Sequence, residues 1–533
     1  QQQIQYGSGL GICLCLVSGA ETAVMDGQLL RARILCYLPL LVAAIYLVVV
    51  TVPVLGIYGL WFDEIFSVEM SQDFSSVLRM VQTQENNMLL HYLLLRLWLP
   101  LGDGGEVFLR LSSLLLVLLS LLPLHAAARR LSNIAVANYS CLFYVSHYLV
   151  LQHAEVCRGY SLSLLMTSLL CWRWIVAWQN GKNRDWIIAG FLGGLAVWSH
   201  YFAALATPVL LFAMVWRDGL RQPWRQLCLS ALAWVLAALP IFLTRPPDGA
   251  AQISWADIPT LYATQGTLWM LSGVDGGFEK PTLAILFAAV VFILFLRRQQ
   301  WRAAHDWRNP VVGIAAGLLL TVLAVLLESF VGQPLFVPRF FTPLAPLYSV
   351  VIGAMLVLLW PWLRYSLLVA ILATSFYETW RPFVTEPVPL RFWWKPMVLQ
   401  VLQDLQPGDV ILVYPSFLRM PVDYYLDYFS DRYDPQKKLP RPTEYASGYY
   451  RQGGGDEPEP DWQEIKRLTD SGARIWLLAE EKNNPNWRRL HRTHLPTIRS
   501  QLLQSRVPGY EKHYYSFSIQ RFDMPRQHPD SAP

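Results

Sequence analysis

Two adjacent carboxylates follow the first long apolar run of the chain. The run from Ile34 to Leu60 is long enough to cross a bilayer, and Asp63 and Glu64 stand just beyond its end. An unpaired charge at a membrane boundary is costly to desolvate, so ionisable groups there need a partner or a chemical task. Such a carboxylate can deprotonate an acceptor hydroxyl as a general base, or it can only mark the end of a helix.

Other polar residues stand at the ends of apolar runs and fall on the same predicted side of the membrane. Cations stabilise a departing phosphate, and a guanidinium matches phosphate oxygens, which suits Arg158 and Arg339 to that task. Arg158 can equally pair with Glu155, one helical turn away. We therefore consider as candidate site residues Asp63, Glu64, Glu85, His91, Glu155, Arg158, Tyr160, His200, Tyr201 and Arg339.

No compact metal-binding motif occurs in the sequence. His200 follows an apolar run, where a histidine is more often a packing residue than a ligand. A cation would need convergent acids such as Asp63 and Glu85 beside His200. The seven cysteines show no ligand spacing and read as small buried hydrophobes. The sequence therefore requires no cofactor, and it leaves a divalent cation open.

The composition is that of a polytopic membrane protein. Of 533 residues, 54% are hydrophobic and only 15% are charged, against about a quarter charged in soluble proteins. The formal charge of +5 does not indicate nucleic-acid binding, because the basic residues form short clusters between apolar runs. We expect about eleven spans, at 34–60, 106–127, 132–152, 160–178, 186–201, 203–216, 226–244, 281–297, 310–330, 339–360 and 362–380.

The basic clusters orient these spans. They fall in alternate connections, and the positive-inside rule places all of them on the cytoplasmic side. The loop 61–105 then faces outwards with the chain from about 381 onwards. Residues 74–81 and 88–101 predict helices along the membrane interface within that loop. The connection 245–280, rich in Trp and Gly, predicts either a lid or an interfacial loop. Residues 7–20 are apolar but short, and we leave them unassigned.

The chain after residue 381 changes in composition. Segments 409–414, 473–478 and 514–522 have the β-branched and aromatic content of strands, and 391–405 and 485–505 are helical in pattern. We expect three parts: an N-terminal segment (1–33), a transmembrane catalytic domain (34–380) and an outer α/β domain (381–533) with a disordered tail. Binding or capping suits this last domain better than catalysis, because it has no phosphate-loop or dinucleotide motif.

Five motifs together resemble the GT-C membrane glycosyltransferases. They are Trp-Phe-Asp-Glu-Ile-Phe-Ser at 61–67, the segments 87–98 and 106–113, a Glu-x-x-Arg-x-Tyr pattern within 152–161, and Arg-Phe-Phe-Thr-Pro within 337–346. The chain is similar in particular to the bacterial RgtA/B/C/D-like branch, which is related to protein O-mannosyltransferases and aminoarabinose transferases. The resemblance covers roughly residues 30–360.

The resemblance implies inverting transfer of a sugar from a polyprenyl-phosphate donor to a glycan, lipid or protein acceptor outside the cytoplasm, at a bacterial inner membrane. Asp63 matches the family's catalytic base, with Glu64 beside it. Glu85 falls near a second loop acid of the aminoarabinose branch. The sequence departs there, because Asn87 and Met88 replace the usual double proline and no lysine follows Glu85. Phosphate binding then falls to Arg158 and Arg339.

Two other classes of function compete with a transferase. A transporter or flippase of lipid-linked saccharides predicts charged residues near the membrane midplane and inverted repeats, whereas here the charges gather at span ends. A non-catalytic scaffold of an envelope polysaccharide assembly would tolerate substitutions at the site but would depend on residues 381–533.

Overall fold

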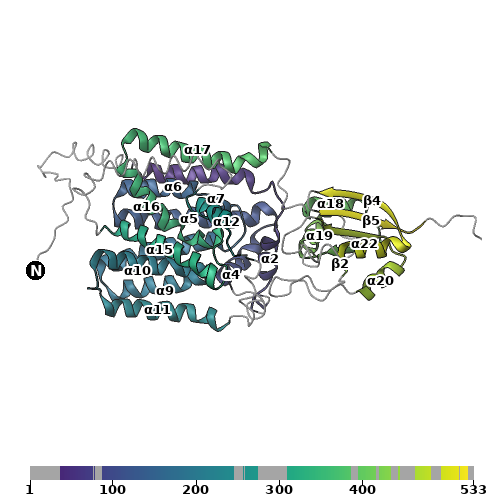
Figure 1. Ribbon diagram of the computed structural model, residues 1–533, viewed down its shortest axis with the longest axis horizontal. Helices are drawn as coiled ribbons and strands as arrows, with labels where there is room; N and C mark the ends of the chain where they lie inside the picture. The colour runs from purple at the N-terminus through teal and green to yellow at the C-terminus, as the bar shows by residue number, and fades with distance from the viewer. Residues whose placement is uncertain are drawn as a thin grey trace, which may run out of the picture.

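Most of the described chain is a bundle of helices that run side by side (Figure 1). Because a bilayer core offers no water, each backbone N–H and C=O group there must find its partner within the protein, which a helix achieves. Among the described residues, seven helices are long and apolar enough to cross a membrane. The chain is therefore a multi-pass membrane protein. The computed structural model describes residues 36–75, 77–78, 87–244, 256, 258–273, 309–385, 394–415, 419–433, 442–443, 462–481, 494–514 and 517–525.

These seven helices coincide with expected spans. They are Cys36–Val54 (ending in η1, Val52–Val54), α5 (Glu106–Leu131), α8 (Tyr160–Asn180), η3 and α10 together (Tyr201–Leu205, Ala206–Asp218), α11 (Trp224–Leu243), α15 (Pro310–Val331) and η5 with α16 (Pro338–Leu344, Ala345–Leu358). Two more helices, α9 (Asn183–Ser199) and α17 (Pro361–Thr385), run beside them (Figure 1). The expected span 281–297 and the stretch 7–20 lie outside the described residues, so the count of eleven stays a prediction.

Histidines interrupt the helical bundle at two places. The expected span 132–152 is divided at His147 into α6 (Ile134–Ser146) and α7 (Tyr148–Ala154), which meet at 61°. A second break follows α9 at His200, where the sequence predicts one. In each break the imidazole Nδ1 accepts a bond from the backbone N–H two residues later, at 3.2 Å. This bond satisfies one of the donors that a helix start leaves without an intrahelical partner.

The connection 245–280 contributes one described helix, α12 (Leu261–Leu271). Its end is bonded to the bend at His147: the imidazole Nε2 lies 3.2 Å from the Leu271 carbonyl, and Tyr148 N–H donates to Gly273 O at 2.9 Å. This part of the connection is therefore fixed to the bundle, beside α7 and η5.

Glycines bring α9 and α11 into close contact. A Cβ atom at Gly190 would lie 2.0 Å from the Ser230 carbonyl oxygen, and one at Gly194 would lie 2.4 Å from Trp234 O. Within a membrane, where neighbouring lipid is as apolar as the helices, such close backbone contact is a main source of helix association.

We expect Gly190→Ala to destabilise the protein by about 1–3 kcal/mol, because backbone atoms must move apart to admit the methyl group. The thermal midpoint of the detergent-solubilised protein would measure this loss. Gly266→Ala is the matched control, since a Cβ atom in that helix meets nothing within 4 Å. Equal midpoints for the two variants would contradict the prediction.

The C-terminal region is a five-stranded sheet with helices on both faces. The strand order is β2-β1-β3-β5-β4, with β2, β1 and β3 parallel and the last two strands antiparallel to their neighbours. The strands are β1 (Val410–Tyr414), β2 (Pro442–Thr443), β3 (Ile475–Glu480), β4 (Val507–Tyr514) and β5 (Phe517–Asp523); the helices are α18 (Trp394–Asp404), α19 (Arg419–Tyr433), α20 (Trp462–Asp470) and α22 (His494–Ser505).

The sequence locates β1, β3, β5, α18 and α22, but it misses β2, β4, α19 and α20. The expected strand 514–522 corresponds to β5, except that it starts too early. Tyr514 ends β4, and β5 begins at Phe517 and runs antiparallel to it. The inner strands β1 and β3 are buried on both faces, and successive side chains point to opposite faces. Residues such as Leu412 face α20 and α22, while Ile411 and Val413 join the core with α18 and α19.

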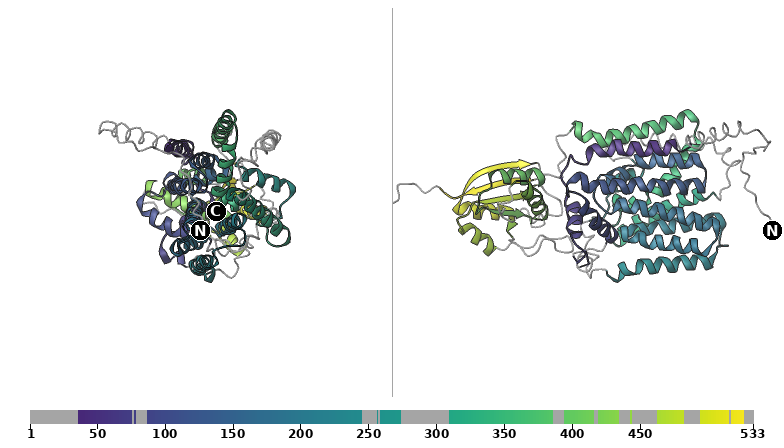
Figure 2. Two further views of the ribbon diagram at one scale, coloured as in Figure 1. Left: turned by 90° about the vertical axis from the view of Figure 1, so that its left-hand side faces the viewer. Right: turned by 180° about the vertical axis from the view of Figure 1, so that it is seen from behind.

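The sheet region lies at one end of the helical bundle, next to the loop that follows the first span (Figures 1 and 2). That loop contains α2 (Phe62–Met70) and α4 (Leu89–Trp98, continued by η2, Leu99–Leu101). The short apolar helix expected at 88–101 is thereby confirmed. Of the expected helix 74–81, residues 74, 75, 77 and 78 are described and helical, and the other four lie outside the described residues. One apolar core joins α2 and α4 to α18 and α19. The sheet region is thus packed on the loop that carries the two carboxylates.

Candidate active site

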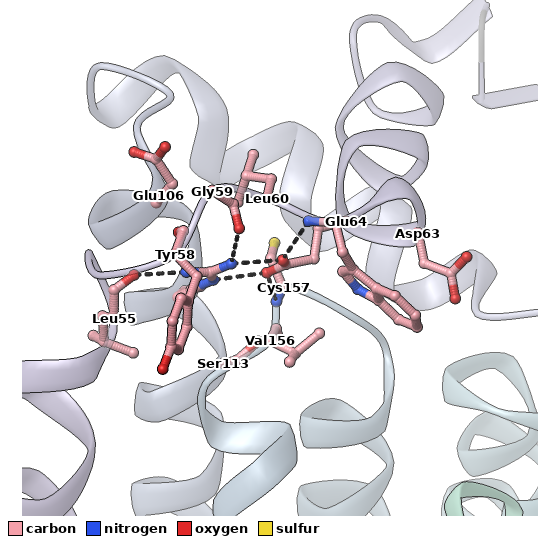
Figure 3. Close-up of polar contacts among 12 residues, drawn as sticks. Leu55, Tyr58, Gly59, Leu60, Asp63, Glu64, Glu106, Ser113, Val156 and Cys157 are labelled. Atoms are coloured by element: carbon pink, nitrogen blue, oxygen red, sulfur yellow. Dashed lines mark hydrogen bonds and ion pairs between the residues drawn. The ribbon is translucent and has the colours of Figure 1, made fainter. Parts of the chain in front are cut away.

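The adjacent carboxylates point in different directions (Figure 3). Helix α2 begins at Phe62, so Asp63 and Glu64 lie about 100° apart around its axis. The Glu64 side chain is fully buried, and its two oxygens accept four hydrogen bonds. Two of these come from Arg110, one from Cys157 N–H at 2.9 Å and one from Trp61 N–H at 3.1 Å. This carboxylate ties the start of α2 to two other segments of the chain.

Arg110 of α5 completes this network and uses all five of its N–H donors. Two bonds, at 2.9 and 2.8 Å, go to Glu64. The other three, at 2.8 to 2.9 Å, go to carbonyl oxygens of the segment before α2, those of Leu55, Tyr58 and Gly59. The sequence places Arg110 only in the motif 106–113. Its role could not be predicted, because its partners lie about fifty residues earlier in the chain.

Asp63 is the accessible member of the pair. Its side chain is 31% exposed, and its Oδ2 atom lies 4.0 Å from a guanidinium nitrogen of Arg158. Arg158 also donates to the backbone carbonyl of Asp63 at 3.1 Å and to Ser67 Oγ at 2.9 Å. The structure therefore brings together the predicted base and the first predicted phosphate-binding cation, from segments 95 residues apart.

Aromatic and imidazole rings extend from Arg158 toward Arg339. Tyr160 stacks on His153 with 4.2 Å between ring centroids and lies 4.8 Å from His200. His200 in turn lies 6.0 Å from Phe340, the residue after Arg339. Burial lowers the pKa of His200 well below its usual range, with the charges of Arg158 and Arg339 acting in the same direction. His153, which the sequence interpretation does not single out, lies within the quoted motif 152–161.

The remaining predicted residues are placed less uniformly. Burial lowers the pKa of His91 in α4 to about 3, and the charge of Arg158 adds to the effect, so this imidazole is neutral beside the site. Tyr201 donates its backbone N–H to Asn87 Oδ1 at 3.0 Å, and its ring packs on the contact between α9 and α11. Glu85 lies outside the described residues. Among the described residues, no group of three His, Cys, Asp or Glu side chains is arranged to hold a metal ion.

Glu155 lies between α7 and α8, and its Oε1 atom has neither solvent contact nor a hydrogen-bond partner among the described residues. Burial raises the pKa of this carboxyl to about 8, against a smaller opposite effect of Arg110. Because the pKa is raised in the folded state, the stability that the protonated Glu155 contributes is fully present below pH 4.5. This contribution is lost as the pH rises through about 8.

We therefore expect wild-type protein to lose thermal stability as the pH rises from about 4.5 to about 8. Glu155→Gln, which mimics the protonated acid, should lose less over the same range. Unfolding midpoints of both proteins across this pH range measure the difference. Parallel pH profiles would show that Glu155 does not titrate in this window.

The fold can be compared with known proteins. ArnT from Cupriavidus metallidurans in the apo state superimposes with a TM-score of 0.58 at 15% identity, covering 92% of this chain and 98% of that one. ArnT from the same organism bound to undecaprenyl phosphate gives a TM-score of 0.52 at 14% identity, covering 91% and 97%. This chain has the GT-C fold. The predicted resemblance to GT-C membrane glycosyltransferases and the predicted fold class are thereby confirmed.

The sequence comparison agrees with this GT-C assignment over part of the chain. Residues 86–244 match the family model described as dolichyl-phosphate-mannose-protein mannosyltransferase. No curated protein matches the sequence. The matched region runs from the end of the first loop through α11 and includes Arg110, Arg158 and His200.

Proposed function

We propose that this GT-C protein transfers a sugar from a polyprenyl-phosphate donor to an acceptor outside the cytoplasm, with inversion at the anomeric carbon. One observation carries the proposal: a partly exposed carboxylate, Asp63, lies 4.0 Å from the guanidinium of Arg158 at the end of a membrane bundle. Sugar transfer from a phosphate ester needs a base close to a cation that binds the phosphate.

The reaction follows from these groups. Asp63 takes the proton of the acceptor hydroxyl while that oxygen attacks the anomeric carbon. The bond from this carbon to the phosphate oxygen breaks, and its electron pair leaves with polyprenyl phosphate. Arg158 and Arg339 stabilise the negative charge that develops on the phosphate. The uncharged rings of Tyr160, His153 and His200 pack together near the two cations.

Glu64 takes a positioning role in this proposal. The sequence groups it with Asp63 as catalytic, but its oxygens are buried and already accept four bonds. It fixes the first turn of α2 and so the direction of Asp63. The proposed substrate-binding residues also include Glu85, His91, Glu155 and Tyr201. A divalent cation is optional in this mechanism.

The location of the protein is part of the proposal. Positive charges such as those of Arg129 and Arg130 stand at the far end of α5 from Asp63 and Glu64, which supports a site on the extracytoplasmic side of a bacterial inner membrane. The donor would then be a lipid of the same bilayer. The C-terminal region would face the same side as the acceptor.

Turnover of a panel of short-chain polyprenyl-phosphate monosaccharides by purified protein tests the function. We expect one sugar to be consumed with stoichiometric release of polyprenyl phosphate and an inverted anomeric configuration by NMR. Movement of intact donor across proteoliposomes without cleavage would instead favour a flippase. Failure to bind any lipid-linked sugar would favour a scaffold.

A further inference from the structure

A phenol from the C-terminal region lies where the chain enters α2. Tyr425 of α19 is fully buried, and its oxygen accepts the backbone N–H of Leu60 at 2.6 Å. The same hydroxyl donates to Glu106 Oε1 at 3.2 Å. Lys395 of α18 reaches this oxygen of Glu106 at 2.8 Å, so that an ion pair and a phenol meet at the first residue of α5.

This junction adjoins the Arg110 network. Arg110 binds the carbonyls of Tyr58 and Gly59, and Tyr425 accepts the next backbone N–H, that of Leu60. The segment that leads into α2 is therefore held by the membrane bundle from one side and by the C-terminal region from the other. A buried backbone N–H needs a partner, and the chain supplies this one from 365 residues away.

We propose that Tyr425, with Glu106 and Lys395, positions the catalytic carboxylate, so that the C-terminal region is a working part of the active site. The inference rests on the proposed transferase function. Leu60 is three residues before Asp63 and two residues before the start of α2, so the junction is close to the base along the chain. The expected role of this region in binding or capping is thereby extended to alignment of the reacting groups.

Tyr425→Phe removes one hydroxyl and preserves the packed ring. We expect kcat to fall roughly ten-fold, as for loss of a buried hydrogen bond. Donor Kd should stay within two-fold of wild type, because Arg158 and Arg339 lie on other segments. Amide hydrogen exchange in residues 58–66 should accelerate. Lys395→Met weakens the same junction and should also lower kcat and accelerate exchange in residues 58–66. It replaces Tyr425→Phe as the test if that variant is unstable.

Tyr424→Phe is the matched control. Tyr424 is the neighbouring residue of α19, and it donates to Gly104 O at 2.5 Å without bonding to Leu60 or Glu106. This variant should keep kcat and exchange in 58–66 within two-fold of wild type. Equal losses in the two tyrosine variants, or none in Tyr425→Phe, would overturn the proposal. If wild-type protein transfers no sugar, the proposed function fails, and the exchange readout still decides whether the junction holds this segment.

Discussion

Asp63→Asn is expected to abolish sugar transfer, with kcat reduced by about 10²–10⁴-fold, because the amide cannot accept the proton of the acceptor hydroxyl. Donor binding should persist, since Arg158 and Arg339 are unchanged. The bond from Arg158 to the Asp63 backbone carbonyl also persists, so the site should stay assembled. Single-turnover kinetics and a donor-binding isotherm on the purified variant measure the two effects separately.

Asp73→Asn makes the same chemical change in the same loop and serves as the control. Asp73 is exposed and accepts a hydrogen bond from Ser75 Oγ, outside the site. It should keep wild-type turnover and donor affinity. A transfer rate in Asp63→Asn within a few-fold of wild type would remove Asp63 as the base.

Arg110→Met should cause the largest loss of stability. It leaves the Glu64 carboxylate buried without its cation and removes the donors from three carbonyl groups. Removing one partner of a buried ion pair typically costs about 3–5 kcal/mol. This loss is close to the smallest free energies of unfolding of whole domains, about 5 kcal/mol. We expect little monodisperse protein after detergent extraction, which size-exclusion chromatography of matched preparations would measure.

An exposed pair of the same chemistry is the comparison. Arg467 binds Glu464 through two hydrogen bonds in α20, but its side chain is 72% exposed. Arg467→Met should cost less than about 1 kcal/mol and leave the elution profile unchanged. The double variant Glu64→Leu with Arg110→Met should recover part of the loss, because no unpaired charge stays buried. Normal yield of the single variant Arg110→Met would show that this network does not limit folding.

The sequence predicts those features of the fold that local pattern controls. Apolar runs mark the spans, and His200 marks a real break, because length and hydropathy are properties of neighbouring residues. The bend at His147 could not be predicted in the same way. There the run 132–152 stays apolar, and the capping bond of the imidazole and the contact with α12 are tertiary.

The candidate site shows the same limit. Sequence identifies Asp63, Arg158, Tyr160 and His200 as residues on one side, and the structure brings them together. Position in the sequence alone does not distinguish Asp63 from Glu64, since both are acids at the same boundary, and only the family resemblance favours Asp63. Arg110 of α5 binds Glu64 and so distinguishes it from the accessible Asp63, and Tyr425 of α19 binds the segment that precedes both. Such contacts across 46 and 365 residues leave no local trace in the sequence.

The start of α2 also constrains the length of the chain before it. Each residue turns an α-helix by about 100°, so deleting one residue between Leu60 and Asp63 would carry a different side chain toward Arg110. The hydrophobic Ile65 would then take the position of Glu64 against the buried guanidinium, and Glu64 would take the partly exposed position of Asp63. This segment should accept changes of side chain far more readily than a change in the number of residues. Alignments of related chains should accordingly show gaps elsewhere in the first loop and none here.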